Sequence, residues 1–316
     1  MKDSDTVFMD RALELARAGE GLVSPNPLVG AVIVKDDRIA GEGFHLYERL
    51  KHAESYALEA AGESARGAVL YCSLEPCCHE GRTSPCTDAI IESGLARVVI
   101  AIEDPDPRVN GKGIRLLMHA GIEVDVGLRA EEARRQNECY IKHISTKIPF
   151  AHLILPPSDG DNWRPSQDLL GDLFRYDALV VNSADDAGKA ILNSFISRPK
   201  HRRAEVIMLE EAHKAAIDDR FARSAAYFNT LDKERGNLSA ILELAKERAL
   251  TSLAIIGDSV LRSTAEIDAI DKITTVRRDD SIEEPEVFSW NDRRVVLIDP
   301  KIVATKGTIE VTGYPG

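Results

Sequence analysis

Strand-forming and helix-forming segments alternate along the first 150 residues of this chain, and this alternation narrows the folds open to it. Apolar runs at 31–35 and 38–43 flank Asp36-Asp37 and predict a β-hairpin. A hairpin followed by repeated β-α alternation predicts a mixed, largely parallel sheet covered by helices. Further strands are predicted at 68–73, 97–102 and 122–126, and helices at 6–18, 52–61, 87–93, 113–120 and 131–145.

The alternation resumes after a segment rich in turn formers, Pro156-Pro157-Ser158-Asp159-Gly160, which is the predicted domain boundary. A length of 316 residues is typical of two domains. We therefore expect one α/β domain over 1–150 and a second α/β domain over 151–316. The second is predicted from strands at 178–181, 205–209, 225–228, 252–256 and 295–298 and from a helix at 238–249.

The chain is acidic, with 40 Lys and Arg residues against 52 Asp and Glu residues and a net charge of −12. Each half carries −6, so neither has the basic footprint that binding a nucleic-acid backbone requires. No run of about 18 apolar residues is present, which excludes a spanning helix. The first ten residues hold no apolar signal core. We expect a cytoplasmic protein without a nucleic-acid or membrane partner.

All five cysteines lie in the first half, at positions 72, 77, 78, 86 and 139. A disulfide framework favours a short secreted chain with an even number of cysteines. Clustered cysteines in a cytosolic protein instead indicate metal binding or catalysis. The chemistry of this chain is therefore predicted to reside in its first half.

One histidine and two cysteines have the spacing of a catalytic zinc site. His52-Ala53-Glu54 opens a predicted helix, Cys77 follows a predicted strand, and Cys86 begins the next predicted helix. Catalytic zinc takes three protein ligands and keeps one position for water. The zinc deaminase signature is H-x-E followed by P-C-x-x-C, and here eight residues separate the two cysteines. His52, Cys77 and Cys86 are the predicted ligands, and Glu54 is the predicted general acid and base.

Two other interpretations of this pattern stay open. Cys78 or His79 could complete a four-ligand structural zinc site, which would make the chain a non-catalytic scaffold. The pattern also fits a deaminase of free bases or of RNA, against which the long cysteine loop and the acidic charge argue. Replacing Glu54 separates the catalytic site from the structural one.

Several further segments accompany the zinc pattern: Pro25-Asn26-Pro27, Gly41-Glu42-Gly43-Phe44-His45, Leu74 to Cys86 with Gly81-Arg82-Thr83, Asp104-Pro105-Asp106-Pro107, and Gly111-Lys112-Gly113-Ile114. With these residues the first half resembles the riboflavin-biosynthesis pyrimidine deaminases, the N-terminal half of the bifunctional deaminase–reductase. The resemblance implies a cytidine-deaminase-like three-layer α/β/α fold with Zn2+. The implied substrate is a pyrimidine ribonucleotide, 2,5-diamino-6-ribosylamino-4(3H)-pyrimidinone 5′-phosphate. Asn26 and His45 match base-contacting and ribose-contacting positions, and the loop with His79 and Arg82 suits a sugar phosphate.

The second half matches the bifunctional relatives less well. The resemblance implies a dihydrofolate-reductase-like fold that uses NADPH, but the expected lysine before Ser-Leu-Asp-Gly is replaced. The expected Glu-Gly-Gly turn reads Ile256-Gly257-Asp258, where a carboxylate would repel a cofactor phosphate. We expect a degenerate reductase-like domain that does not bind NADPH. A retained reductase activity, a separate reductase and a homo-oligomer stay open as alternatives.

Overall fold

The computed structural model divides into two compact units, Met1–Thr146 and Lys147–Gly316. It describes residues 3–49, 51–81, 83–157, 163–181, 186–197, 205–208, 227–230, 237–257, 261, 264–278, 286–290, 293–305 and 308–316. The division precedes the turn-rich segment predicted as the boundary. Strand β6 (Phe150–Leu155) lies before that segment yet belongs to the second unit, because β10 (Ser252–Ile256) and β11 (Lys272–Arg278) pair with it on either side.

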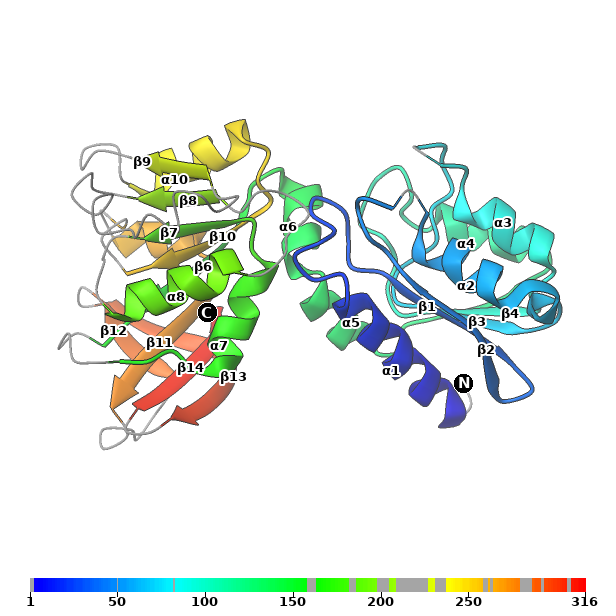
Figure 1. Cartoon of the computed structure of the whole chain (residues 1–316), viewed down its shortest axis with the longest axis horizontal. Coiled ribbons are helices and arrows are strands. Elements are labelled where there is room, and N and C mark those ends of the chain that lie inside the picture. The colour runs from blue at the N-terminus through cyan, green and yellow to red at the C-terminus, as the bar shows by residue number, and fades with distance from the viewer. Residues whose placement is uncertain are drawn as a thin grey trace. The chain divides into compact units, whose positions relative to one another are not determined.

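The described residues of the first unit form a five-stranded sheet in the order β2-β1-β3-β4-β5. Strands β1 to β4 are labelled in Figure 1. β1 pairs antiparallel with β2 and β3, whereas β3, β4 and β5 run parallel. The predicted hairpin turns at Asp36 and Asp37, whose positive φ angles of 50° and 58° suit a two-residue hairpin turn. The strands are β1 (Gly30–Lys35), β2 (Arg38–Phe44), β3 (Val69–Cys72), β4 (Arg97–Ile100) and β5 (Glu123–Val126).

Helices cover both faces of this sheet because alternate strand residues point to opposite sides. On β1, Ile33 packs in one buried cluster and Val32 in another. The Ile33 cluster includes α2 (Ala53–Ala61), α3 (Cys86–Ser93) and α4 (Lys112–His119), and the Val32 cluster includes α1 (Asp3–Arg17) and α5 (Ala130–Gln136). The first unit is therefore a three-layer α/β/α domain.

The helix predicted over residues 131–145 is interrupted in the structure. α5 ends at Gln136, and α6 (Glu138–Thr146) begins after Asn137. The Asn137 side chain is buried, and it accepts a hydrogen bond from Leu28 N (2.8 Å) and donates one to Leu28 O (2.9 Å). This contact spans 109 positions of the sequence, so helical periodicity alone gave no sign of the interruption.

Two glycines on β2 bring α2 unusually close to the sheet. A Cβ at Gly41 would collide with the backbone oxygen of Ala57, and one at Gly43 would collide with that of Ala53. Only glycine permits such an approach of strand and helix. The first turn of α2 is thereby fixed against the sheet, immediately beside His52 and Glu54.

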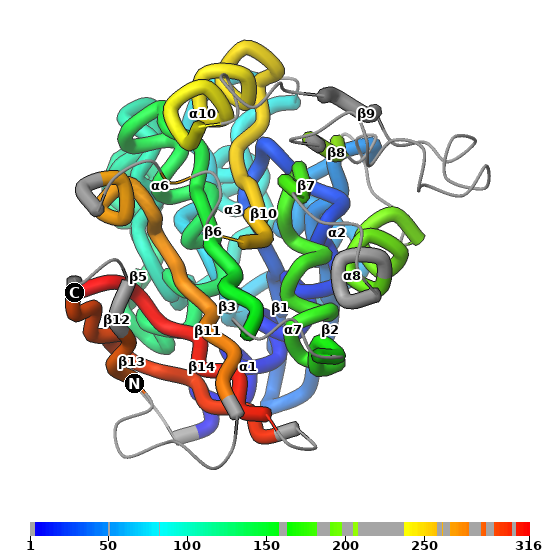
Figure 2. Tube along the Cα trace, turned by 90° about the vertical axis from the view of Figure 1, so that its left-hand side faces the viewer, coloured from blue at the N-terminus to red at the C-terminus, as the bar shows by residue number. Residues whose placement is uncertain are grey.

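The second unit contains a sheet in which the described strands follow the order β12-β13-β14-β11-β6-β10-β7-β8-β9 (Figure 2). Strands β11, β6, β10, β7, β8 and β9 are parallel, whereas β14 and β13 continue the sheet as an antiparallel hairpin. The strands not yet given bounds are β7 (Ala178–Val181), β8 (Glu205–Met208), β9 (Tyr227–Thr230), β12 (Val287–Trp290), β13 (Arg293–Thr305) and β14 (Thr308–Pro315). The predicted strand 295–298 is part of the longer β13.

One face of this second sheet is apolar and the other is partly polar. Leu153, Ile255 and Ile273 pack against α10 (Leu238–Glu247) and the 3-10 helix η4 (Thr264–Ala269) in a single buried cluster. The other face carries the buried polar side chains of His152, Thr274 and Glu310. His152 hydrogen-bonds to Thr274 and to Tyr176, and Glu310 accepts from Ser166, the N-cap of α7 (Gln167–Asp172). A further helix, α8, spans Asp186–Ser197. Within the described residues, no helix is both long enough and apolar enough to cross a membrane.

Candidate functional site

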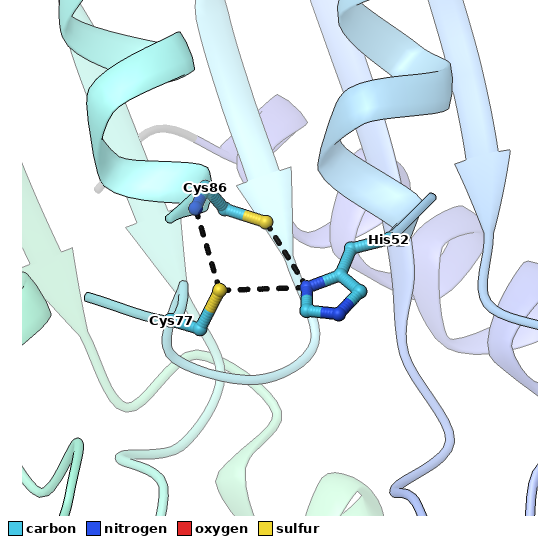
Figure 3. A group of neighbouring side chains, drawn as sticks. All are labelled: His52, Cys77 and Cys86. Atoms are coloured by element: carbon cyan, nitrogen blue, oxygen red, sulfur yellow. Dashed lines mark hydrogen bonds between the residues drawn. The ribbon is translucent and has the colours of Figure 1, made fainter. Parts of the chain in front are cut away.

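Three predicted metal ligands meet at one end of the first sheet. His52 occupies the N-cap of α2, Cys86 is the first residue of α3, and Cys77 lies in the loop that follows β3. Their side chains point toward one another (Figure 3), with His52 Nδ1 3.2 Å from Cys86 Sγ and 3.4 Å from Cys77 Sγ. All three candidate ligand atoms lie within 4.8 Å of one another.

This donor set fits zinc. Tetrahedral zinc with Zn–N and Zn–S bonds of about 2.1 and 2.3 Å separates neighbouring nitrogen and sulfur donors by about 3.6 Å. The observed separations of 3.2 and 3.4 Å are close to that value. Among the described residues, no fourth ligand joins this group, since Cys78 Sγ contacts the backbone oxygen of Arg108 at 3.8 Å. The set therefore has the composition of an open site rather than that of a closed structural one.

The electrostatics of the cluster favour a thiolate at Cys77. Cys77 Sγ accepts hydrogen bonds from the Cys86 side chain, from His52 and from the Cys86 backbone N–H (3.3 Å). These bonds lower the pKa of Cys77 to about 4. The same contact with Cys77 raises the pKa of His52 to about 9. On metal binding the imidazolium would release its proton, so that the neutral imidazole and the thiolate could both act as ligands.

Glu54 lies in the first turn of α2, two residues after His52, and is only 3% exposed. Burial is the main reason that the pKa of this carboxyl rises to about 7, and the neighbouring Cys77 thiolate adds to the effect. A carboxyl with a pKa near neutrality exchanges protons in both directions at physiological pH. A pKa in this range is compatible with the general acid and base role predicted for Glu54.

A cavity of about 460 Å³ opens beside the cluster, entirely within the first unit. That volume is typical of a site for a small molecule. Of the residues assigned from the sequence, six line it: Asn26, His45, His52, Glu54, Cys77 and His79. Asn26 Nδ2 lies 3.0 Å from His45 Nε2, and His79 Nδ1 is buried with no hydrogen-bond partner among the described residues. Arg82, also assigned to the substrate, lies outside the described residues.

The cavity wall includes further polar residues to which the sequence analysis gave no role: Tyr47, Arg49, Glu75, Thr83, Asp104, Asp106, Arg108, Tyr140 and His143. The motif Asp104-Pro105-Asp106-Pro107 was noted for its resemblance to the family and could have suggested the two aspartates. No local pattern points to Tyr140 or His143, because α6 joins the cavity only through the tertiary fold.

Glu75 connects the loop that carries Cys77 to the 104–111 loop and the start of α4. Its buried carboxylate accepts backbone hydrogen bonds from Asp104 (3.2 Å), Gly111 (2.8 Å) and Ile114 (3.2 Å). A Cβ at Gly113 would also collide with the backbone oxygen of Pro76. The strand end, the 104–111 loop and the start of α4 are thereby held together beside the metal cluster.

Comparison with known proteins places these features in a family. Residues 2–102 match the cytidine and deoxycytidylate deaminase zinc-binding region. The riboflavin biosynthesis protein RibD of Aquifex aeolicus is 51% identical over 153 residues, which cover 48% of this chain but only 43% of that relative. The diaminohydroxyphosphoribosylamino-pyrimidine deaminase of Buchnera aphidicola subsp. Schizaphis graminum is 46% identical over 145 residues, covering 46% of this chain and 99% of that relative.

Solved structures extend the similarity to the second unit. A diaminohydroxyphosphoribosylaminopyrimidine deaminase/5-amino-6-(5-phosphoribosylamino)uracil reductase from Thermotoga maritima is similar with a TM-score of 0.77 and 28% identity over 99% of both chains. RibD of Acinetobacter baumannii has a TM-score of 0.72 and 26% identity, also over 99% of both chains. The deaminase-like fold expected for the first half and the reductase-like α/β fold expected for the second are confirmed.

Proposed function

This chain belongs to the family of riboflavin-biosynthesis pyrimidine deaminases and is a hydrolytic deaminase, and on that premise we propose its substrate and the roles of its residues. The proposed substrate is 2,5-diamino-6-ribosylamino-4(3H)-pyrimidinone 5′-phosphate, which loses its C2 amino group as ammonia. The observation that carries the proposal is that Glu54 lines the same cavity as His52 and Cys77, two members of the three-ligand cluster.

His52, Cys77 and Cys86 are the proposed zinc ligands. Bound zinc acts as a Lewis acid that lowers the pKa of water toward about 7 and so supplies a nucleophile at neutral pH. The protein contributes the thiolate, because the contacts of Cys77 already favour its deprotonated form.

Glu54 is the proposed proton carrier. Water adds to C2 as Glu54 takes one of its protons, and the same carboxyl then protonates the ring nitrogen. Glu54 then takes the proton of the new C2 hydroxyl and passes it to the C2 amino group, the C–N bond breaks, and ammonia leaves as the C2 carbonyl forms. Its buried position keeps the carboxyl close to the cluster and excludes bulk water from these transfers.

The remaining assigned residues are proposed to hold the nucleotide. Asn26 and His45, which lie in hydrogen-bonding contact, face the cavity where the base and ribose would bind. His79 enters the same cavity from the long cysteine loop, and Arg82 follows it in the sequence. Imidazole and guanidinium groups suit the sugar phosphate.

A product assay tests the substrate. The chain loaded with zinc is incubated with the diaminopyrimidine nucleotide, and mass spectrometry follows replacement of the amino group by oxygen while ammonia is measured in parallel. We expect stoichiometric ammonia without NADPH. Turnover of cytidine or adenosine in RNA with no turnover of the nucleotide would contradict the proposal.

Glu54→Gln distinguishes catalysis from a structural zinc site. The amide keeps the shape of the side chain but does not exchange protons, so we expect ammonia release to fall by about a hundredfold to ten-thousandfold. Zinc content, measured by atomic absorption, should stay at the wild-type level. An unchanged rate would support a scaffold with structural zinc.

For the second unit we propose a reductase-like domain that no longer binds NADPH. Two differences from the family pattern support this. The expected lysine is absent from the segment around β6, and Gly257-Asp258 stands after β10 in place of the Glu-Gly-Gly turn, although Asp258 itself lies outside the described residues. A retained reductase activity is the second candidate, which the Thermotoga maritima similarity over the whole chain favours. If cofactor binding is lost, a separate reductase acts on the deaminated product. A cytoplasmic location and a homo-oligomeric assembly complete the proposal.

NADPH titration decides between the two. Trp163 is buried in the second unit and gives an intrinsic fluorescence signal. We expect no saturable change, and saturable binding at low micromolar NADPH would establish the bifunctional alternative. The product assay repeated with NADPH reports reduction of the ribosyl group directly.

A further inference from the structure

Helix α6 supplies part of the cavity wall although it lies outside the residues that match the deaminase zinc-binding region. Tyr140 connects it to the loop after β4: the phenol donates a hydrogen bond to Asp104 Oδ1 at 2.9 Å. Both residues line the cavity, and they are 36 positions apart in the sequence. This bond therefore joins two walls of the cavity that the chain forms separately.

Asp104 is oriented closely by its contacts. It is 7% exposed, and its Oδ1 accepts the Tyr140 hydroxyl and also the backbone N–H of Asp106 (2.9 Å). Its own backbone N–H donates to Glu75. Within the described part of the chain, both side-chain hydrogen bonds end on Oδ1, so Oδ2 keeps its acceptor capacity.

We propose that Tyr140 is a positioning residue of the deaminase cavity, whose hydroxyl holds Asp104 in the orientation that presents Oδ2 to an N–H or O–H donor of the bound nucleotide. The inference rests on the proposed function for the identity of that nucleotide. A carboxylate fixed in advance binds a donor more tightly, because the side chain loses less conformational freedom on binding.

The Tyr140 hydroxyl also helps to keep the Asp104 carboxyl in its charged form. Burial raises the pKa of this carboxyl to about 6, and the neighbouring Asp106 and Glu75 carboxylates add to the rise. The bonds from the Asp106 N–H and the Tyr140 hydroxyl oppose it by stabilising the charged form. Removing the hydroxyl should therefore raise the pKa of Asp104 and leave a larger fraction protonated at neutral pH.

The test is Tyr140→Phe, which removes one oxygen and keeps the ring. We expect KM for the diaminopyrimidine nucleotide to rise about fivefold to tenfold, as for a contact whose orientation is no longer fixed. The value of kcat should stay within about twofold, because Glu54 and the zinc ligands are untouched. When KM is plotted against pH, its rise on the acid side should move to higher pH, because the pKa of Asp104 is raised in the variant.

Tyr71→Phe is the matched control. Tyr71 is 3% exposed and donates a hydrogen bond to Asp5 Oδ1 at 2.7 Å, so it loses the same type of bond in the same unit. It does not line the cavity. We expect a lower melting temperature with unchanged KM and pH profile. An equal rise of KM in both variants, or none in Tyr140→Phe, would overturn the inference.

An activity-free measurement keeps the inference separate from the proposed function. Carbon-13 NMR of labelled aspartate carboxyls, with Asp104 assigned through Asp104→Asn, reports its titration directly. The Asp104 titration should move to higher pH in Tyr140→Phe and stay in place in Tyr71→Phe. A wild-type chain that fails to convert the nucleotide contradicts the proposed substrate, whereas an unmoved Asp104 titration contradicts the role of Tyr140.

Discussion

A histidine in the first unit and one in the second lie in contrasting surroundings. In the first unit His52 lies at the edge of a cavity beside two thiols. In the second unit His152 is fully buried, with Nδ1 2.8 Å from the Tyr176 hydroxyl and Nε2 2.8 Å from Thr274 Oγ1. Both ring nitrogens of His152 are thus used within the protein. A buried polar group becomes a site only where some of its bonding capacity faces a cavity.

The helix N-termini show the same contrast. In the second unit, Ser166 and Asn237 cap α7 and α10 with side-chain hydrogen bonds. In the first unit, the α2 N-cap is His52, which makes no capping bond. The first unit uses the position for a predicted ligand, and the second uses it for stability.

Among the contrasts between the two units, the largest expected effect comes from breaking the metal cluster. Cys86→Ala removes one of three ligands, so we expect zinc to be lost and deamination to fall by about a thousandfold, the loss that several kcal/mol of transition-state stabilisation implies. His152→Gln is the counterpart in the second unit and should change neither zinc content nor rate. Zinc retained at full activity in Cys86→Ala would contradict the ligand assignment.

The next effect concerns stability in the second unit. The Ser166 N–H and hydroxyl both donate to the buried carboxylate of Glu310. Glu310→Ala leaves two buried donors without an acceptor, which should lower the free energy of unfolding of this unit by about 3 kcal/mol. Urea denaturation measures it. Lys301→Ala removes the exposed ion pair with Asp168 (2.9 Å) and should change stability by less than about 1 kcal/mol.

The pH dependence of the second unit follows from His152. Burial is the main cause that lowers its pKa to about 3, and Lys272 and Arg175 lower it further, while Asp172 opposes them. The unfolded chain takes up this proton below about pH 6.5, while the folded chain resists it. Stability is therefore present above pH 6.5 and declines as the pH falls toward 3, by about 2 kcal/mol between pH 7 and 5.

His152→Gln should remove that part of the pH dependence. The pKa of Asp172 is lowered, with burial opposing the effect of Lys272 and Arg175, so its contribution changes only at lower pH. Urea denaturation of both proteins at pH 7 and pH 5 separates the two groups. If the free energy of unfolding falls equally between pH 7 and pH 5 in the variant and the wild type, His152 is not the titrating group.

The smallest effects are those at the helix caps, and they should have opposite signs. Asn237 Oδ1 accepts the Ala240 N–H at 2.9 Å, so Asn237→Ala should cost about 1 kcal/mol in the second unit. The α2 N-cap is extended, with φ −80° and ψ 168°. His52→Asn should therefore add a capping bond and stabilise the metal-free first unit by about 0.5 kcal/mol, with loss of zinc. Thermal unfolding without metal measures the stability of both variants. A loss of stability in His52→Asn would contradict the predicted opposite signs.

Local patterns predicted much of the first unit. The hairpin at Asp36-Asp37, the alternation that produces the parallel strands, and the spacing of His52 and Glu54 depend on neighbouring residues, whose geometry is set by helix and strand periods. The second unit was harder to predict from its sequence. Its sheet contains β11 and β14, which carry Thr274 and Glu310 and were not predicted, because their polar residues mask the strand pattern.

The sequence by itself determined the family and predicted the ligand set and the proton carrier, because each is written in short motifs with fixed spacing. Only the tertiary structure decided that Asn137 interrupts the last helix and that Tyr140 reaches Asp104. It also decided that His152 is enclosed whereas His52 faces a cavity. These outcomes depend on hydrogen bonds between residues 24 to 122 positions apart, or on the packing around a side chain, which periodicity within one segment does not encode.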